Sequence, residues 1–337
     1  MLSIDDCIIA TNEEWDEVWR ESESATYFHS REWAETWYTY TNGAMSPQPR
    51  KIIFSDGKTV LLPIMCQNYY GGIIKRYALT GPHFISKYGN WLSRTLVNEQ
   101  HISLLTAYII NTFKNVTWQL NPFDKYSKQI ITESKYVTRV PHVAYAIDLT
   151  KGENVIYSNL KPSCRNHIKQ AVRNDLRVSE CTTIDYMKIY YDIYLDNVKR
   201  WGNKSPYTLD WKLFEILIKK NSATKLWLVW HNEIAIAGCI NFYSNGKIIG
   251  WHMASLTKYL HLRPVHLLEY SMIKDGISNN YSWYDMGTDA GSQGLRNFKK
   301  SFGPEKLMCD KIYAWHPVLM YLVRLRNIIR YNKTQSI

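Results

Sequence analysis

The chain has 337 residues, of which 45% are hydrophobic and 21% are charged. This length predicts two domains of ordinary size, and the composition excludes a disordered chain. The sequence contains no apolar run long enough to span a bilayer, and its acidic start, MLSIDDCIIATNEEWDEVW, lacks the pattern of a signal peptide, so we expect a cytoplasmic protein.

The positive charge is concentrated in the second half of the chain. Residues 1–150 carry 14 basic and 15 acidic side chains, whereas residues 151–337 carry 27 basic and 15 acidic ones. This asymmetry favours a polyanionic partner for the second half. Nucleic acid, a phosphorylated small molecule and an anionic membrane surface all fit it.

The six cysteines are widely scattered and form no Cys-x-x-Cys pair. A zinc site or a disulfide framework needs closely spaced pairs, so we expect neither, and no other metal. We expect buried free thiols instead.

The first half of the chain begins with a strand near residues 7–10 and two helical patterns. An antiparallel meander and a helix follow, and Asp56-Gly57 between apolar runs is a hairpin signal. The expected elements are helices over 15–19, 33–40 and 99–113, and strands over 51–54, 59–67, 73–78 and 115–119.

The second half repeats this order of elements. It predicts strands over 226–231, 233–243 and 247–255, a helix over 264–277 and a further strand, and helices over 186–201 and 209–220 precede them. Asn115-x-Thr117-Trp118 and Asn280-x-Ser282-Trp283 match at an offset of 165 residues. We infer two copies of one unit, with domains over 1–150 and 151–315. A basic amphipathic helix over 316–337 would pack at the end or lie on an anionic membrane.

A row of cations marks the helix expected over 162–173, which lies between the two halves. Lys161, Arg165, Lys169 and Arg173 recur every four residues, opposite an apolar stripe. The row could follow a phosphate backbone or diphosphate, or it could be a solvated face.

The stretch from Tyr281 to Gly303 predicts a strand over 281–286, a turn over 287–293 and a helix from Gly294. Helical periodicity places Leu295, Phe298 and Phe302 on one apolar face, with Lys299 at its edge. A lysine in that position either covers apolar surface or places its charge in a cleft.

Three motifs give the chain a family resemblance. They are L-K-x-x-x-R-N-x-I-K-x-A at 160–171, Y-D-M-G at 284–287 and G-L-x-x-F-K-K-x-F-G at 294–303. With the opening FHSREWAETW at 28–37, they resemble the Fem-type transferases and the related acetyltransferase branch of the GNAT superfamily. The resemblance covers nearly the whole chain, and the Phe-Lys-x-x-Phe-Gly element is its most specific part.

This resemblance implies an α+β fold of tandem GNAT-like domains with mixed, mostly antiparallel sheets. It also implies transfer of an aminoacyl group from a charged tRNA to an amine on a cell-envelope or other anionic small-molecule precursor. Its Phe-Lys pair lies at the reaction centre, which carries over to Phe298 and Lys299. We expect no cofactor beyond the donor substrate.

One departure bears on the choice of donor. GNAT enzymes that use acetyl-CoA hold its pyrophosphate in a glycine-containing loop at a helix N-terminus. Here His266 and Leu268 replace the small residues, and Pro264 has no N–H to donate. An acyl-CoA donor is therefore the alternative and aminoacyl-tRNA the expectation.

Further side chains complete the candidate site. Lys299 would stabilise the oxyanion of acyl transfer. Asp285 and Asp289 could orient the amine or cap the helix, and His252 could act as a base or be structural. The candidate substrate- and donor-binding residues are Arg165, Lys169, Arg173, Arg200, Arg263 and Arg296.

Two other functions remain open. A non-catalytic nucleic-acid-binding protein would explain the charge asymmetry but not the Phe-Lys-x-x-Phe-Gly element. A CoA-dependent N-acyltransferase acting on an amino sugar or nucleotide sugar would explain both domains and the basic second half.

Overall fold

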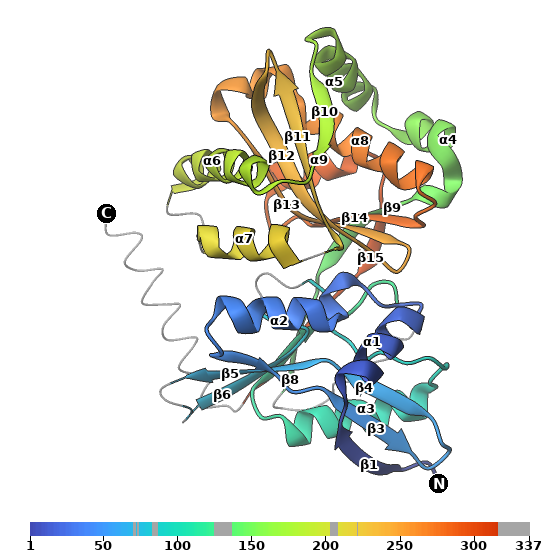
Figure 1. The fold of residues 1–337 in the computed structure, drawn as a ribbon. Coiled ribbons are helices and arrows are strands. Elements are labelled where there is room, and N and C mark those ends of the chain that lie inside the picture. Colours follow the sequence, from blue (N-terminus) through green and yellow to red (C-terminus); the bar gives the residue numbers. More distant parts are fainter. Residues whose placement is uncertain are drawn as a thin grey trace, which may run out of the picture. The chain divides into compact units, whose positions relative to one another are not determined.

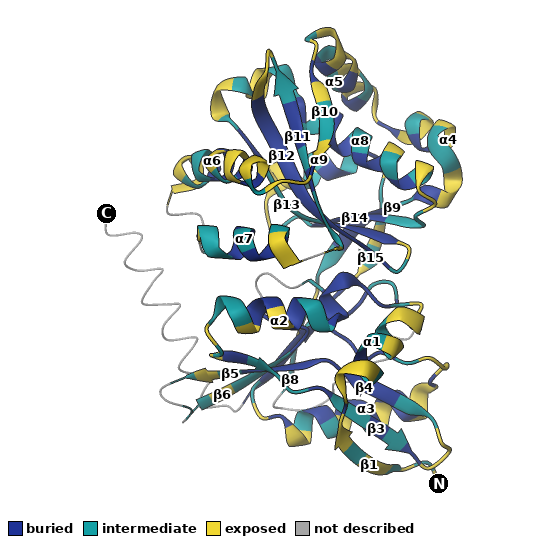
Figure 2. Cartoon of the chain, viewed as in Figure 1, coloured by how far each residue is buried: buried dark blue, intermediate teal, exposed yellow. Residues whose placement is uncertain are grey.

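The computed structural model describes residues 1–69, 72, 74–82, 87–124, 137–202, 208–220 and 222–315. The chain divides into two compact units (Figure 1). The first comprises Met1–His142 together with the chain from Met308, and the second is Val143–Leu307. Each unit has its own hydrophobic core, and Figure 2 shows buried residues concentrated on its central strands.

The first unit contains two sheets. Its strands are β1 (Ile4–Ile9), β2 (Met45–Pro47), β3 (Arg50–Phe54), β4 (Thr59–Leu62), β5 (Ile64–Tyr69), β6 (Ile74–Leu79), β7 (Val116–Gln119), β8 (Val137–Val140) and β16 (Lys311–Ala314), and its helices are α1 (Asn12–Glu21), α2 (Arg31–Tyr40) and α3 (Glu99–Thr112). The larger sheet has the order β2-β5-β6-β7-β16-β8, and β1-β3-β4 form a small antiparallel sheet. Pro63 separates β4 from β5, which the sequence had suggested were one strand, because proline cannot donate to a strand ladder.

Local signals explain where the helices of the first unit begin. Thr11 and Glu14 form a reciprocal capping box at the start of α1. Asn98 accepts hydrogen bonds from the first amides of α3. Buried residues of α3, including Leu105 and Ile109, then pack with Trp118 of β7 in one core cluster.

The second unit is built on one seven-stranded sheet. Its strands are β9 (Val143–Asp148), β10 (Arg177–Cys181), β11 (Thr224–His231), β12 (Ile234–Ser244), β13 (Lys247–Ser255), β14 (Trp283–Thr288) and β15 (Glu305–Met308), and its helices are α4 (Gly152–Asn159), α5 (Pro162–Arg173), α6 (Ile184–Trp201), α7 (Trp211–Lys220), α8 (Pro264–Ser278) and α9 (Gln293–Lys300). The sheet order is β10-β11-β12-β13-β14-β9-β15. Only the β13–β14 pair is parallel among the neighbours whose register the structure defines.

The two faces of this sheet are covered by different helices (Figure 1). Tyr243 and Tyr284 share a core cluster with Leu268 and Met272 of α8. On the opposite face, α6 packs against β12 and β13, and Phe214 of α7 lies beside rings from both α6 and β13. The sheet is therefore a middle layer between helices, as expected for a three-layer α+β unit.

The internal duplication predicted from the sequence is present in the topology. In the first unit, β6 pairs parallel with β7 and α3 connects them; in the second, β13 pairs parallel with β14 and α8 connects them. The matched tryptophans, Trp118 and Trp283, lie on the corresponding strands β7 and β14. Both units thus repeat one antiparallel meander, helix and parallel strand.

The boundary between the units differs from the predicted one near residue 150. Strand β9 lies before that boundary in sequence but pairs with β14 in the second sheet. Strand β16 lies after the second unit but pairs with β7 in the first sheet. Each sheet therefore takes one strand from the other half of the sequence, so domains over 1–150 and 151–315 would each lack a strand of their own sheet.

Other expectations have mixed outcomes. All six cysteines are free, and all except Cys7 are buried, as expected. Within the described parts of the chain, no helix is both long enough and apolar enough to cross a membrane. The helix predicted over 316–337 lies outside the described residues.

Candidate active site

Strands β13 and β14 diverge part-way along their length. Their pairing extends from Lys247 opposite Trp283 to Ile249 opposite Asp285 and then stops, although both strands continue. At the point of divergence, a Cβ on Gly250 would lie 3.1 Å from the Asp285 carbonyl oxygen, so glycine allows this close approach. Beyond this point the two strands do not pair with each other, and strands that separate in this way can admit a ligand between them.

Lys299 supplies a positive charge beside this divergence. It is 6% exposed, and its ammonium donates to the carbonyl oxygens of Met286 and of Thr288, the latter at 2.6 Å. Both carbonyls belong to β14 beyond the last residue paired with β13.

Lys299 was predicted at the edge of the apolar face, but it is more deeply buried than that position implies. Lys299 is buried, whereas Leu295 on that face is 37% exposed. The carbonyl groups of β14 compensate for the desolvation of the ammonium.

The turn that joins β14 to α9 is held by charged hydrogen bonds. The Asp289 carboxylate accepts from Arg296 Nε at 2.6 Å, from the Tyr145 hydroxyl at 3.2 Å and from the Gly291 amide at 2.9 Å. The Arg296 bond is the main cause that lowers the pKa of Asp289. Arg296 is thereby engaged within the turn, and Asp289 serves as its anchor.

Asp285 is fully buried on β14. Its Oδ1 accepts from the Gly287 amide at 2.7 Å, where Gly287 adopts a positive φ of 76°. This is an Asx-type contact that shapes the start of the turn. Asp285 and Asp289 both accept hydrogen bonds within the turn. The suggestion that they cap the helix is wrong, because Ser292 is the N-cap of α9 and accepts from the Leu295 amide at 3.3 Å.

The start of α8 offers few main-chain donors. Arg263 precedes the helix in a left-handed conformation with φ of 63°. Pro264 has no N–H, and the His266 amide donates to the Arg263 carbonyl at 3.1 Å. Among the first three residues of α8, Val265 is therefore the one whose amide N–H is neither missing nor bonded to the Arg263 carbonyl.

Aromatic rings surround this helix start. His266 Nε2 lies 3.1 Å from Nδ1 of His167 on α5, and the His266 ring packs edge-on against Phe298 at 5.0 Å. Phe302 stacks on His266 at 6.1 Å and also contacts Phe298 at 5.3 Å. Burial, with the nearby His167 and Arg263, lowers the pKa of His266 to about 4. We name His167, His266, Phe298 and Phe302 the His–Phe cluster.

His252 lies on the opposite face of the sheet, in the part of β13 beyond its pairing with β14. Its ring is enclosed by those of Tyr190, Tyr194, Phe214 and Trp251. Nδ1 lies 2.6 Å from the Tyr190 hydroxyl. Burial lowers the pKa of His252 to about 4, so the ring is neutral at pH 7.

The cation row on α5 does not act as one surface. Arg165 Nη1 donates to three carbonyls at the end of α4: Leu160 at 2.6 Å, Ser158 at 3.0 Å and Tyr157 at 3.4 Å. Lys161, Lys169 and Arg173 are exposed. Figure 2 shows exposed residues along α5, so three members of the row remain available to a polyanion.

Arg200 has a structural position. Its guanidinium donates to Asn197 Oδ1, to the Ser255 carbonyl at 3.3 Å and to Thr257 Oγ1 at 3.3 Å. Asp196 also accepts from Thr257, at 2.8 Å from its amide. Together these bonds attach the end of α6 to the end of β13.

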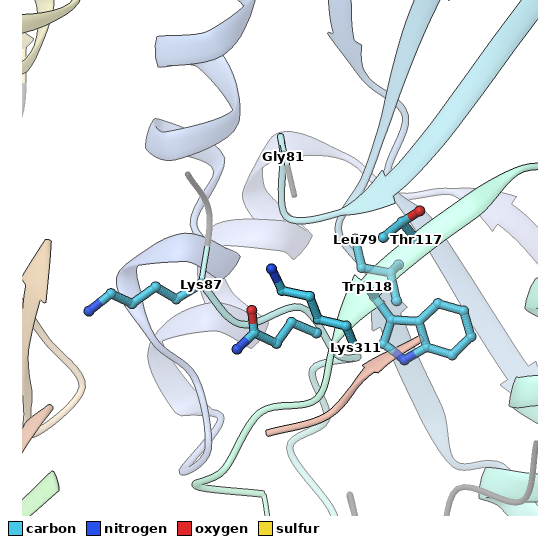
Figure 3. Close-up of a pocket in the computed structure, with 7 residues that line it drawn as sticks. Leu79, Gly81, Lys87, Thr117, Trp118 and Lys311 are labelled. Carbon is cyan, nitrogen blue, oxygen red and sulfur yellow. The ribbon is translucent and has the colours of Figure 1, made fainter. Parts of the chain in front are cut away.

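A small pocket lies at the corresponding place in the first unit (Figure 3). Its lining residues come from the end of β6, from β7, from β16 and from the chain near Lys87: Leu79, Gly81, Lys87, Thr117, Trp118, Gln119 and Lys311. Burial lowers the pKa of Lys311. Lys311 lies on a strand, β16, that pairs with β7, so it does not correspond to Lys299 on helix α9.

The structure brings some predicted residues together and separates others. Phe298, Lys299 and Arg263 lie around α8 and α9, whereas Arg165 and Arg200 are tied to helix ends elsewhere. The sequence reasoning missed Tyr190 and the His167–His266 pair. Their partners lie 62 and 99 residues away along the chain, and no local pattern marks such contacts.

Comparison with known proteins agrees with this architecture. Residues 162–300 match the family model described as an acetyltransferase (GNAT) domain. A search of curated proteins gives no match.

Solved structures extend the similarity beyond the GNAT domain. FemX superposes with a TM-score of 0.69 at 13% identity, covering 94% of this chain and 99% of FemX. L-PGS from Bacillus licheniformis gives 0.52 at 15% identity, covering 82% of this chain and 88% of that one. A tandem GNAT protein from the clavulanic acid biosynthesis pathway gives 0.50 at 8% identity, covering 93% and 98%. At these identities the likeness establishes the fold alone, that of two GNAT-like units in one chain.

Proposed function

We propose that the protein is an N-acyltransferase that moves an aminoacyl group from aminoacyl-tRNA to an amine on an anionic cell-envelope or small-molecule precursor. The observation that carries the choice of donor is the start of α8. Pro264 and the engaged His266 amide remove two of the first three N–H groups that would hold a pyrophosphate. The basic second half and the exposed cations of α5 suit an RNA backbone instead.

Lys299 suits the chemistry of this transfer. The acceptor amine attacks the ester carbonyl of the donor, and the ribose oxygen leaves and takes up a proton. The tetrahedral intermediate carries an oxyanion that a fixed positive charge stabilises. Lys299 is held by β14 beside the strand divergence, and its neighbour Phe298 belongs to the His–Phe cluster.

A direct assay distinguishes the two donors. Purified protein is mixed with either labelled aminoacyl-tRNA or labelled acetyl-CoA, and retention and transfer of the label to amine acceptors are measured. We expect retention of aminoacyl-tRNA, and retention of acetyl-CoA alone would refute the proposed donor. An acyl-CoA-dependent reaction on an amino sugar is the second candidate, because the matching family model describes acetyltransferases.

The α5 surface gives a second test of the tRNA donor. Reversing Lys169 and Arg173 to glutamate should weaken tRNA binding and reduce the slope of log affinity against log salt by about 1 for each phosphate that the variant no longer binds. Arg165 provides the contrast, because its guanidinium is already bonded to α4. Binding that is insensitive to salt in the unmodified protein would contradict an interaction with the RNA backbone.

A further inference from the structure

The contact between His252 and the buried Tyr190 fixes where the imidazole proton lies. Tyr190 is 0% exposed, and its hydroxyl lies 2.6 Å from His252 Nδ1. Within the described chain, this hydroxyl has no other hydrogen-bond partner. A buried O–H that donates to nothing costs about 1–3 kcal/mol, so the proton of Tyr190 points to Nδ1.

The consequence for the imidazole follows from its two nitrogens. A neutral imidazole has one N–H donor and one acceptor nitrogen. Since Nδ1 accepts from Tyr190, the ring proton lies on Nε2. Nε2 has no partner among the described residues, and His252 keeps part of its surface exposed.

The fold maintains the position of Tyr190 tightly. A Cβ on Gly238 of β12 would lie 2.8 Å from Tyr190 Cδ2 and 2.7 Å from the Trp227 carbonyl oxygen. Only glycine leaves room for the ring there. Phe214 packs against the same ring at 6.2 Å.

We propose that Tyr190 is a positioning residue that holds His252 as its neutral Nε2–H tautomer, so that His252 acts as a hydrogen-bond donor to substrate and not as a general base. A base would need a free lone pair on the outward-facing nitrogen, and this tautomer places the lone pair on Nδ1, where Tyr190 uses it. The low pKa of the ring agrees, because a neutral donor must not become charged at pH 7. The tautomer follows from the structure alone, whereas its use in catalysis rests on the proposed acyl transfer.

The tautomer is tested by nitrogen NMR on the full chain labelled with 15N-histidine. The signals of His252 are identified by their loss in His252→Gln. We expect a protonated Nε2 and an unprotonated Nδ1 at pH 7, and we expect Tyr190→Phe to change this pattern. Tyr194→Phe is the matched control, since its ring also contacts His252 but its hydroxyl accepts from the Leu209 amide at 2.7 Å.

The outcome does not depend on any activity. A proton on Nδ1, or a cationic ring at pH 7, in the unmodified protein would overturn the proposal even if Tyr190→Phe failed to fold. An unchanged His252 pattern in folded Tyr190→Phe would also overturn the role of Tyr190.

The catalytic use is tested separately by two substitutions. Glutamine places an N–H close to the position of Nε2 but is no base, so we expect His252→Gln to stay within about 10-fold of normal turnover. His252→Phe removes the donor and should lose about 100- to 1,000-fold, the usual cost of one such donor. Equal, large losses in both variants would show a base instead, and no loss in either would remove His252 from the site while leaving acyl transfer itself intact.

Discussion

Lys299 is the residue whose substitution best separates catalysis from structure. Its ammonium could stabilise an oxyanion, yet it also bonds two carbonyls of β14. We predict that Lys299→Met lowers turnover about 100- to 1,000-fold. The same change should lower the free energy of unfolding by about 1–3 kcal/mol, because buried carbonyls lose their partner. Turnover and denaturant unfolding measured on one preparation give both quantities.

Lys300→Met is the control for this prediction, since Lys300 is the next residue on α9 and is more exposed. It should change neither quantity appreciably. If normal turnover persists in folded Lys299→Met, the lysine is purely structural.

His252 and His266 make the stability of the protein depend on pH. Burial lowers both pKa values from 6.5 to about 4. Between these values the unfolded chain binds more protons than the folded one, so stability is complete above pH 6.5 and falls as the pH decreases toward 4. At pH 4 each histidine has lowered the free energy of unfolding by about 3 kcal/mol relative to its value above pH 6.5.

Thermal unfolding between pH 7 and 4.5 checks this dependence, in a range where most carboxylates remain ionised. We expect the melting temperature to fall with pH, and to fall less in a variant with glutamine at both positions. A slope that is unchanged in that variant would assign the pH dependence to other groups.

At the scale of elements, Arg165 shows how one side chain joins two helices. It lies on α5 and bonds the carbonyls that end α4, at distances down to 2.6 Å. A cation at a helix C-terminus donates to carbonyls that have no partner within the helix. It also interacts favourably with the partial negative charge at that end of the helix. We therefore predict that Arg165→Met lowers the free energy of unfolding by about 1–2 kcal/mol. Chemical denaturation measures this, with the exposed Lys169→Met as the neutral counterpart, and equal stability of the two variants would contradict the capping role.

Most long elements could be predicted from the sequence because their signals are local. The Asn245-Gly246 turn between apolar runs defines the β12–β13 hairpin, and helical periodicity identifies α8 and α9. Short strands such as β9 and β16 carry little local signal, since pairing with distant residues determines their place. The depth of Lys299 was missed for a similar reason, because its partners are main-chain carbonyls that no side-chain pattern marks.

At the scale of the whole molecule, the exchange of β9 and β16 determines which pieces of the chain can fold alone. A fragment over residues 143–307 contains β9 and therefore keeps the strand that pairs with β14. We predict that it folds with a cooperative transition, whereas a fragment over 151–315 aggregates or stays unfolded, because β14 then presents an unpaired edge. Heat-induced unfolding of the two fragments is followed by circular dichroism. A cooperative transition in the 151–315 fragment would show that β9 is dispensable.

The same exchange sets an order of events during synthesis on the ribosome. The first sheet needs β16, which ends at Ala314, so its β7 edge stays open until that strand has emerged. The second sheet waits for no strand later than Met308. The amino-terminal unit is therefore completed last, and its unpaired β7 edge is exposed until then. Exposed strand edges promote aggregation, so we expect chaperones to bind the nascent chain.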